Sequence, residues 1–279
     1  MLELTAGMTE KIIVSLTSYG KRIAGIPLVL DTIVHQTIKP DQVVLNLAFE
    51  ESLTPEVREY LQRNNIEVNR VPDTKVYKKL IPTLRKYPNA CVISIDDDFL
   101  YPNTMVSDFV TMHQRYPDNP LSGNRVVYAG MQCHCGCASL TKASYFDDYL
   151  FQVDDEVIRH CPSDDLLYTY FATKAGHPYM QTDCEYFKNM TGCNNDAEGS
   201  YSQRIDGDKG LEDTMDFLIG RFGPIGDVLP LYVQDAHVAK VIRGIQQNEL
   251  WEMESRIRSS RKYRLGKFLL SPLSWLKNR

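Results

Sequence analysis

No apolar run in the sequence approaches the roughly 20 residues that a membrane-spanning helix needs, which argues against an integral membrane protein. The first residues, MLELTAGMTEK, also lack the apolar core of a secretory signal peptide. A chain of 279 residues can bury about three quarters of its unfolded surface, so it does not need disulfides, and its seven cysteines are an odd number. We therefore expect a reduced, cytoplasmic protein.

Two phosphate-binding motifs are also missing. No G-x-G-x-x-G follows the first apolar run, and no G-x-x-x-x-G-K-[ST] occurs anywhere in the chain. These absences argue against a nicotinamide dinucleotide site and against the P-loop mode of ATP binding. If the protein handles phosphates, a cation held by carboxylates is the expected alternative.

The cysteines lack the paired spacing of a structural zinc site, which usually takes two C-x₂₋₄-C pairs. The segment from Met131 to Cys137 holds three cysteines and one histidine in a C-x-C-x-C pattern, and the other cysteines form no C-x-x-C pair. We expect buried or edge-strand thiols, because free cysteine packs as a small hydrophobic residue. In an extended strand this spacing places three sulfurs on one face, those of Cys133, Cys135 and Cys137.

Charge is unevenly distributed along the chain. Residues 255–279 hold eight of the 31 basic residues and no acidic residue, which leaves 23 basic against 36 acidic residues elsewhere. Within this segment, residues 262–279 read KYRLGKFLLSPLSWLKNR, with aromatic and aliphatic residues between the Lys and Arg. That pattern is typical of a helix lying on an anionic membrane. A helix docked on the body and a nucleic-acid-binding tail are alternatives, and the aliphatic content favours membrane over nucleic acid.

Strands and helices alternate through the first hundred residues. Short apolar runs predict the strands, and helical periodicity, with a Thr54-Pro55-Glu56 start in one case, predicts the helices. This alternation predicts an α/β fold with a doubly wound, mostly parallel central sheet flanked by helices. The expected strands are 11–16, 43–49, 66–71 and 91–95, and the expected helices are 26–36, 54–61 and 77–84.

The second half of the chain is less regular. Residues 192–210 are rich in Asn, Asp, Ser and Gly, which indicates a mobile loop over the cleft. Asp235 and His237 follow the last expected strand, and His237 is a candidate metal ligand, although a single histidine is more often structural. We expect helices at 104–116, 163–176 and 211–222 and short strands at 125–128, 179–181 and 228–233.

The stretch from Ala90 to Pro102, ACVISIDDDFLYP, is the most informative one in the chain. A short apolar run bounded by turn residues reads as a fully buried strand, and three aspartates stand at its end: Asp96, Asp97 and Asp98. Ligands of open α/β sheets bind at the carboxyl ends of strands, where two carboxylates spaced i, i+2 suit a divalent cation. A solvated acidic turn is the alternative for the triple aspartate taken alone.

Two other segments could face the same cleft. The first expected strand ends in a polar loop, Thr17 to Arg22, in which Tyr19 could stack on a nucleotide base. Later, Ser163 is a good N-cap for a helix that begins with Asp164 and Asp165, and a carboxylate there could act as a general base. A plain connecting turn and a plain capped helix are the alternatives.

Taken together, three segments resemble GT-A glycosyltransferases, close to the family 2-like bacterial enzymes of capsule and lipopolysaccharide synthesis. They are VSLTSYGKR (14–22), YKKLIPTLRKYPNACVISIDDDFLYP (77–102) and SDDLLYTYFATKAG (163–176), and the resemblance covers most of the chain to about His237. The second segment, with a DxD motif at a strand end, is the most specific. The third departs from the family pattern, with Asp164 in place of Glu and Phe171 where Arg is often found.

The resemblance implies a role for each matching residue. Asp96 matches the first DxD aspartate, expected near the ribose or the metal, and Asp98 matches the second, expected to bind Mn²⁺ or Mg²⁺. Asp165 matches the general base of the inverting enzymes, and Asp164 could share that role. Asp97 should point away and tolerate substitution best. Weaker candidates for contacts with the base and phosphates of the donor are Thr17, Tyr19, Lys78 and Lys79.

The resemblance also implies an organisation and an activity. Residues 1–240 would form one catalytic domain, with a nucleotide-binding half (1–103) and an acceptor-side half (104–240), and residues 241–279 a basic, amphipathic helical tail. The enzyme would move a sugar from a nucleotide-sugar, with UDP as the expected nucleotide, to a hydroxyl of a glycan or lipid-linked acceptor. Transfer would invert the configuration at C1 of the sugar. The enzyme would work in bacterial surface polysaccharide synthesis at the cytoplasmic face of the membrane, and nucleic acid is not an expected partner.

Other classes stay open at this point: a cation-dependent nucleotidyltransferase, a phosphohydrolase, or a non-catalytic protein that binds sugar nucleotides. A nucleotidyltransferase usually carries a Gly-, Lys- and Arg-rich loop after its first strand, and this chain offers Gly20-Lys21-Arg22 alone.

Overall fold

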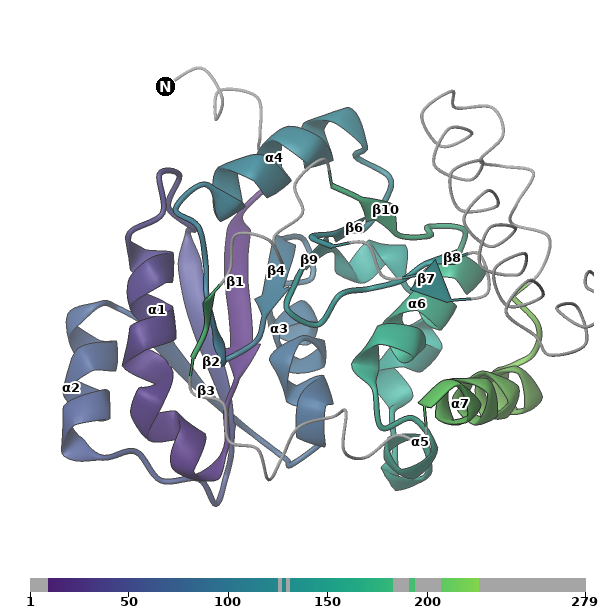
Figure 1. Ribbon diagram of the computed structural model, residues 1–279, viewed down its shortest axis with the longest axis horizontal. Helices are drawn as coiled ribbons and strands as arrows, with labels where there is room; N and C mark the ends of the chain where they lie inside the picture. The colour runs from purple at the N-terminus through teal and green to yellow at the C-terminus, as the bar shows by residue number, and fades with distance from the viewer. Residues whose placement is uncertain (1–9, 125–126, 129–130, 183–190, 194–206, 226–279) are drawn as a thin grey trace, which may run out of the picture. The chain divides into compact units, whose positions relative to one another are not determined.

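The computed structural model describes residues 10–124, 127–128, 131–182, 191–193 and 207–225 (Figure 1). The chain divides after Val228 into two compact units, and the described residues all belong to the first. Three predictions therefore lie outside the described residues: the strand at 228–233, His237 and the tail. Most of the expected loop at 192–210 lies outside as well.

A seven-stranded mixed sheet forms the centre of the first unit, in the order β10-β6-β9-β4-β1-β2-β3. Strands β1, β2, β3 and β4 are mutually parallel, and β9 pairs antiparallel with both β4 and β6. The mostly parallel sheet predicted from the sequence is thus confirmed. The bounds are β1 Ile12–Thr17, β2 Gln42–Ala48, β3 Glu67–Val71, β4 Cys91–Ile95, β6 Leu121–Ser122, β9 Ala138–Thr141 and β10 Met180–Gln181.

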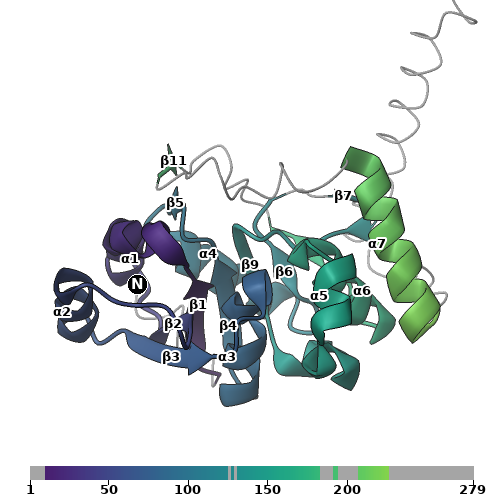
Figure 2. The same ribbon diagram turned by 90° about the horizontal axis from the view of Figure 1, so that it is seen from below.

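Helices cover both faces of this sheet. In both views β1 and β4 lie between α1 and α3, while α5, α6 and α7 gather beyond β9 (Figures 1 and 2). Two short ribbons, β5 (Phe99–Leu100) with β11 (Thr191–Gly192) and β7 (Val127–Tyr128) with β8 (Met131–Gln132), complete the described strands. The helices are α1 Ile26–Val34, α2 Pro55–Arg63, α3 Ile81–Lys86, α4 Met105–Arg115, α5 Asp155–His160, α6 Asp164–Lys174 and α7 Gly207–Phe222. Among the described residues, none of these helices combines the length and apolarity that crossing a membrane requires.

Local sequence explains most of these elements. Every residue of β4 is buried, as expected for a continuous apolar run that is covered on both faces. Helix α2 begins after Thr54, whose hydroxyl accepts a hydrogen bond from the Val57 amide, with Pro55 in the first turn. Helix α6 begins after Ser163 and ends before Gly176, which has a φ of +89°.

One prediction of local structure was confirmed only in part, and another was wrong. The helix expected at 77–84 is a 3₁₀ turn, Lys75–Lys79, followed by α3 from Ile81, because Pro82 would clash with the carbonyl four residues earlier in a continuous helix. Residues 133–137 do not form an extended strand that presents three sulfurs on one face. They form the turn that leads from β8 into β9, and their cysteines are buried, as expected.

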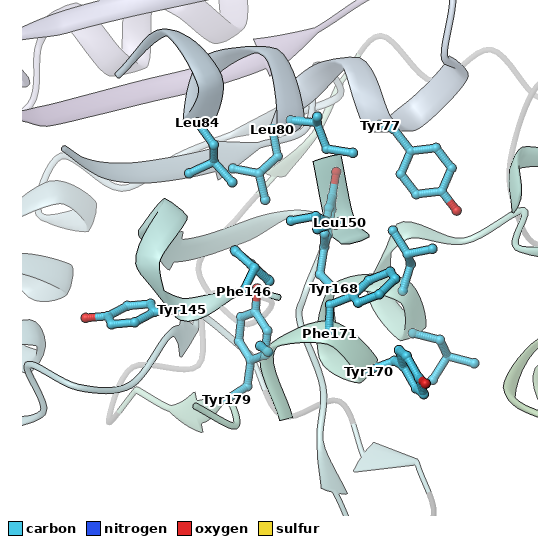
Figure 3. Close-up of a cluster of buried hydrophobic side chains, with 14 of the residues drawn as sticks. Tyr77, Leu80, Leu84, Tyr145, Phe146, Leu150, Tyr168, Tyr170, Phe171 and Tyr179 are labelled. Carbon is cyan, nitrogen blue, oxygen red and sulfur yellow. The ribbon is translucent and has the colours of Figure 1, made fainter. Parts of the chain in front are cut away.

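A cluster of buried hydrophobic side chains joins the 3₁₀ turn Lys75–Lys79 and α3 to α6 (Figure 3). Tyr77 and Tyr168, both about 1% exposed or less, meet edge to face with their ring centroids 6.1 Å apart. The Tyr77 hydroxyl donates to the carbonyls of Cys161 and Ser163, immediately before α6. Buried aromatic pairs of this kind add to the stability gained from area burial. The cluster therefore fixes the start of α6 relative to the parallel sheet.

Candidate active site

Four segments of the chain meet at the carboxyl ends of β1 and β4. The triple aspartate follows β4, the loop Ser18 to Arg22 follows β1, and the first turn of α6 carries Asp164 and Asp165. The fourth segment is the turn around Gly136, which reaches the site because β9 runs antiparallel to β4 and pairs Ala138 with Ile95. The sequence predicted that three of these segments would come together, and the structure brings them together.

Gly136 lies at the centre of this arrangement. A Cβ atom at this position would lie 2.9 Å from Lys79 Nζ, 3.5 Å from Asp165 Oδ1 and 3.5 Å from Asp96 Oδ2. A glycine is needed here because any side chain would occupy the space between the two carboxylates. Asp96 of the DxD motif and Asp165 of the α6 motif therefore face one small volume.

Lys79 holds the acidic residues together. Its ammonium lies 2.8 Å from Asp96 Oδ1 and 2.8 Å from Asp164 Oδ2, and it donates to the Gly136 carbonyl at 3.1 Å. Burial alone would lower the pKa of Lys79, but attraction to Asp164 and Asp96 outweighs burial and raises its pKa well above the ordinary value. The lysine, at 1% exposure, is thus a fixed buried cation, and the expected direct contact with donor phosphates is corrected to a contact with carboxylates.

Asp165 is held by a histidine and a backbone amide. Its Oδ1 accepts from the Gly136 N–H at 2.9 Å and lies 3.2 Å from His134 Nδ1. His134 is fully buried, and its Nε2 lies 3.3 Å from the Ser94 hydroxyl on β4. With the proton on Nδ1, the imidazole donates to Asp165 and accepts from Ser94, so both ring nitrogens have partners.

Asp164 is the neighbouring carboxylate of this helix start, and one of its oxygens lies within 4.8 Å of an oxygen of Asp165. Its side chain is buried and paired with Lys79, whereas that of Asp165 is 31% exposed. Asp165 is therefore the more accessible carboxylate, and Asp164 is occupied in fixing Lys79. The prediction that Asp164 could share the role of general base does not fit this placement, because a buried carboxylate in an ion pair cannot easily meet a substrate hydroxyl.

The expectation that Asp97 points away from its neighbours was wrong, because Asp97 and Asp98 both contact Arg22. Asp97 is buried, accepts from the Ser18 hydroxyl at 2.5 Å and lies 2.5 Å from the Arg22 guanidinium. Burial raises the pKa of Asp97 to about 6, against the opposing effects of Arg22 and Ser18. Asp97 therefore ties the loop after β1 to the end of β4.

Asp98 shares Arg22 with Asp97, at 2.8 Å from its Oδ2. Its other oxygen, Oδ1, is buried and accepts no hydrogen bond from the part of the chain that the structure describes. A buried carboxylate oxygen without a donor is suited to a cation, and a set of carboxylate oxygens matches the preference of Mg²⁺ and Mn²⁺ for hard ligands. Burial raises the pKa of Asp98, and a bound cation would reverse that effect.

The remaining predicted residues lie around this centre. Tyr19 is 39% exposed, with Arg22 over its ring at 5.4 Å from the centroid, so one face of the loop is open to a ligand. Thr17 ends β1, and its hydroxyl donates to the Asn46 carbonyl at 2.8 Å. Lys78 is buried and paired with Asp73, which corrects the expected contact with donor phosphates in the same way as for Lys79.

Sequence reasoning missed three residues of the site: Arg22, His134 and Gly136. Arg22 stood in a loop already singled out, and the excess of carboxylates required a cation nearby. His134 and Gly136 belong to the segment that we interpreted as cysteine packing. The histidine and the glycine between the cysteines were an unusual feature that could have drawn attention to this segment. The sequence did not show that β9 returns antiparallel to β4 and brings the segment to the site.

No protein-family model matches the chain, and no curated protein matches it significantly in sequence. Its fold is similar to that of the mannosyltransferase PcManGT from Pyrobaculum calidifontis, solved in complex with GDP-Man and Mn²⁺. That match has a TM-score of 0.52 at 15% identity, and covers 95% of this chain and 85% of the other. It shows a shared fold, and so confirms the α/β architecture that the sequence predicted.

Two weaker matches complete the comparison. The structure of S. aureus TarS 1–349 with UDP-GlcNAc has a TM-score of 0.46 at 13% identity, covering 63% of this chain and 57% of that chain. A 4-diphosphocytidyl-2C-methyl-D-erythritol synthase has a TM-score of 0.41 at 11% identity, covering 63% of this chain and 91% of that chain.

Proposed function

We propose that this protein is a cation-dependent glycosyltransferase that moves a sugar from a nucleotide-sugar to an acceptor hydroxyl. The observation that carries the proposal is the convergence of Asp96 and Asp165 on the space beside Gly136, together with the buried Oδ1 of Asp98, which accepts no hydrogen bond from the described residues. One carboxylate pair suited to a cation and a separate carboxylate suited to a proton are what this reaction requires. The fold shared with a mannosyltransferase supports the proposal.

Asp96 and Asp98 would hold Mn²⁺ or Mg²⁺. When bound there, such a cation neutralises the diphosphate of the donor and stabilises the leaving nucleotide. Arg22 keeps Asp98 in place through one oxygen, and Lys79 does the same for Asp96. Each aspartate thus retains an oxygen for a ligand while its other oxygen is fixed by a cationic side chain, which limits the reorganisation needed on binding.

Asp165 would remove the proton from the acceptor hydroxyl. Both contacts described above end on its Oδ1, which leaves Oδ2 to accept the proton. The hydroxyl oxygen then bonds to C1 of the sugar while the bond from C1 to the nucleoside diphosphate breaks, and attack from the opposite face inverts C1. His134 and the Gly136 amide hold Asp165 during this step, so they are positioning groups.

Several finer parts of the proposal rest on the sequence. They include UDP as the nucleotide, Tyr19 as the platform for the base and His237 as a further metal ligand. They also include a glycan or lipid-linked acceptor in surface polysaccharide synthesis, and one catalytic domain over residues 1–240. The basic tail would bring this domain to the cytoplasmic face of the membrane, where lipid-linked acceptors lie.

Two substitutions test the assignment: Asp98→Asn and Asp165→Asn. A panel of UDP- and GDP-sugars is added with and without Mn²⁺, and the thermal midpoint is measured, since a ligand at about 100 times its Kd stabilises by about 2.7 kcal/mol. Asp98→Asn should lose the Mn²⁺-dependent shift. Asp165→Asn should keep the shift and lose transfer by about 10²- to 10⁴-fold, as expected for removal of a general base.

Asp155→Asn serves as the matched control, because Asp155 is an exposed aspartate in the first turn of α5, and it should retain both binding and transfer. Full transfer activity in both site variants would refute the assignment. Release of pyrophosphate from a nucleoside triphosphate, with no sugar transfer, would instead identify a nucleotidyltransferase.

A further inference from the structure

Cys135 and Cys137 flank Gly136, and their sulfurs lie 2.8 Å apart in the turn that holds Asp165. This separation is within 1 Å of the about 2.05 Å of a covalent S–S bond. Both thiols are free and buried. We propose that Cys135 and Cys137 form a reversible disulfide, and that this modification controls the position of Gly136.

The surroundings of the two sulfurs favour a thiolate at Cys135, whereas the hydrogen bond to Cys135 and burial raise the pKa of Cys137. The side-chain amide of Asn124 donates to Cys137 Sγ at 3.0 Å and to Cys135 Sγ at 3.5 Å. The hydrogen bond from Cys137 lowers the pKa of Cys135, although burial opposes this effect. By contrast, burial raises the pKa of Cys91 and of Cys161 to about 12. Since the thiolate is the reactive form, oxidation should select Cys135 over these two cysteines.

The oxidant would be a hydroperoxide. The Cys135 thiolate attacks one peroxide oxygen and breaks the O–O bond, which gives a sulfenic acid and, with one proton, water. The Cys137 thiol then attacks the oxidised sulfur, forms the S–S bond and loses its proton, and the sulfenic oxygen leaves as a second water. Two thiols and one hydrogen peroxide thus become one disulfide and two waters, and a dithiol such as dithiothreitol reverses the change.

The consequence for the site follows from the backbone of the turn. The Gly136 N–H donates to Asp165, and its carbonyl accepts from Lys79. The neighbouring carbonyls also accept hydrogen bonds. The Cys137 carbonyl accepts from the Tyr101 hydroxyl at 2.6 Å, and the Cys135 carbonyl accepts from the Ser139 hydroxyl at 2.9 Å. Closing a tight ring over Gly136 must displace the peptide groups between the sulfurs, and hence the amide that positions Asp165. This loss of transfer rests on the proposed function, whereas the disulfide itself does not.

The test treats the full-length, reduced protein with hydrogen peroxide and reads the product by intact mass and by mapping of alkylated peptides. Wild type should lose two hydrogens in mass, with the cross-link between Cys135 and Cys137, and dithiothreitol should restore the mass. Transfer should fall by about a hundredfold and recover in parallel, as expected for a misplacement near 1 Å.

Two variants and one control keep the test falsifiable. Cys137→Ser and, separately, Cys135→Ser should abolish the loss of two hydrogens, while Cys91→Ala, which removes a buried thiol at the opposite end of β4, should retain it. A wild-type protein that keeps both thiols under peroxide, or that cross-links other cysteines, would overturn the proposal. If the reduced protein transfers no sugar, the proposed function fails, and the mass measurement still decides the disulfide. Full transfer in the cross-linked protein would refute control of Gly136.

Discussion

At the scale of single residues, Lys79 allows Asp96 and Asp164 to share one site. A lysine at 1% exposure could not stay charged without the carboxylates of Asp96 and Asp164, and Asp164 could not stay buried without the lysine. Lys79→Met should therefore destabilise the fold by about 3–5 kcal/mol, because it leaves an unpaired buried charge on Asp164. Denaturant unfolding measures this change.

A double variant separates charge from packing at this position. Lys79→Met with Asp164→Asn removes both charges and should recover a large part of the lost free energy of unfolding. Arg63→Met breaks the exposed ion pair with Glu59 and should change stability far less. A double variant that is no more stable than Lys79→Met alone would show that packing of the lysine stem dominates.

Asp97 gives a pH signature. Its carboxyl has a pKa of about 6 when folded against 3.8 as its ordinary value, so the folded state holds a proton between these values that the unfolded state releases. This contribution to stability is fully present below pH 3.8 and is lost as the pH rises through 6, a change of about 3 kcal/mol. Relative to Asp97→Asn, wild type should gain free energy of unfolding from pH 7 to pH 4. A pH-independent difference between the two proteins would contradict this assignment.

Gly136→Ala tests the space between the carboxylates. The new methyl group would meet Lys79 Nζ at 2.9 Å, and that ammonium cannot move away without leaving Asp96 or Asp164. We expect a loss of stability of about 1–3 kcal/mol from overpacking and the loss of the Mn²⁺-dependent thermal shift. Gly220→Ala, on α7 with open space around its Cβ position, is the matched control and should keep the shift. An unchanged shift in Gly136→Ala would place the cation elsewhere.

At this scale the sequence reveals the acidic residues themselves but not their ion-pair partners. Three consecutive aspartates are visible in any sequence, and so is the pair at 164–165. The different roles of these aspartates are not visible, because each role depends on the cationic side chain with which the aspartate pairs. Arg22 takes Asp97 and Asp98, and Lys79 takes Asp96 and Asp164. Arg22 and Asp97 are 75 residues apart in the sequence, and Lys79 and Asp164 are 85 residues apart. Partners so distant in sequence produce no local sequence pattern.

At the scale of elements, predictions from apolar runs and caps succeeded where one element is buried on both faces or begins with a strong cap. Strand β4 and helix α6 are the clearest cases. The prediction of an extended strand at residues 133–137 failed because the sequence there is also compatible with a turn. Tertiary hydrogen bonds determine that the segment forms a turn. The Thr169 hydroxyl accepts from the His134 amide at 2.9 Å, and the Asp165 carboxylate accepts from that of Gly136.

The cap of α6 should therefore matter for both stability and chemistry. The Ser163 hydroxyl accepts from the Asp165 amide at 3.2 Å, so Ser163→Ala should cost about 1 kcal/mol and shift the residue that we propose as the base. Thr54→Ala removes the equivalent cap of α2 and should cost a similar amount of stability. Chemical denaturation and initial rates of transfer distinguish the two, since only Ser163→Ala should lower kcat. Equal rates in both variants would show that Asp165 does not depend on this cap.

At the scale of the whole molecule, the sequence predicts parallel central strands joined by helices but not the far half of the sheet. The right-handed crossover rule fixes how β1, β2, β3 and β4 are joined, because each connection is a helix between parallel strands. Beyond β4 the strands β6, β9 and β10 have two to four residues each. Such short segments carry too little periodicity to reveal that one of them returns antiparallel and closes the site.

Charge is the other property of the whole chain, and it leads to a test of the tail as a membrane anchor. The chain outside residues 255–279 has a formal charge of −13, so anionic lipid should repel it. Each of the five basic residues at 262–279 can contribute about 1 kcal/mol at an anionic surface, and the aliphatic residues between them add apolar contacts. The full chain should therefore sediment with vesicles that contain phosphatidylserine, and less so as salt is raised.

Deletion of residues 262–279 should leave the protein in the supernatant. Replacement of these five residues by Gln should reduce binding to phosphatidylserine vesicles while sparing any weak binding to phosphatidylcholine vesicles. Equal sedimentation of the full and shortened chains would show that the tail is not the anchor.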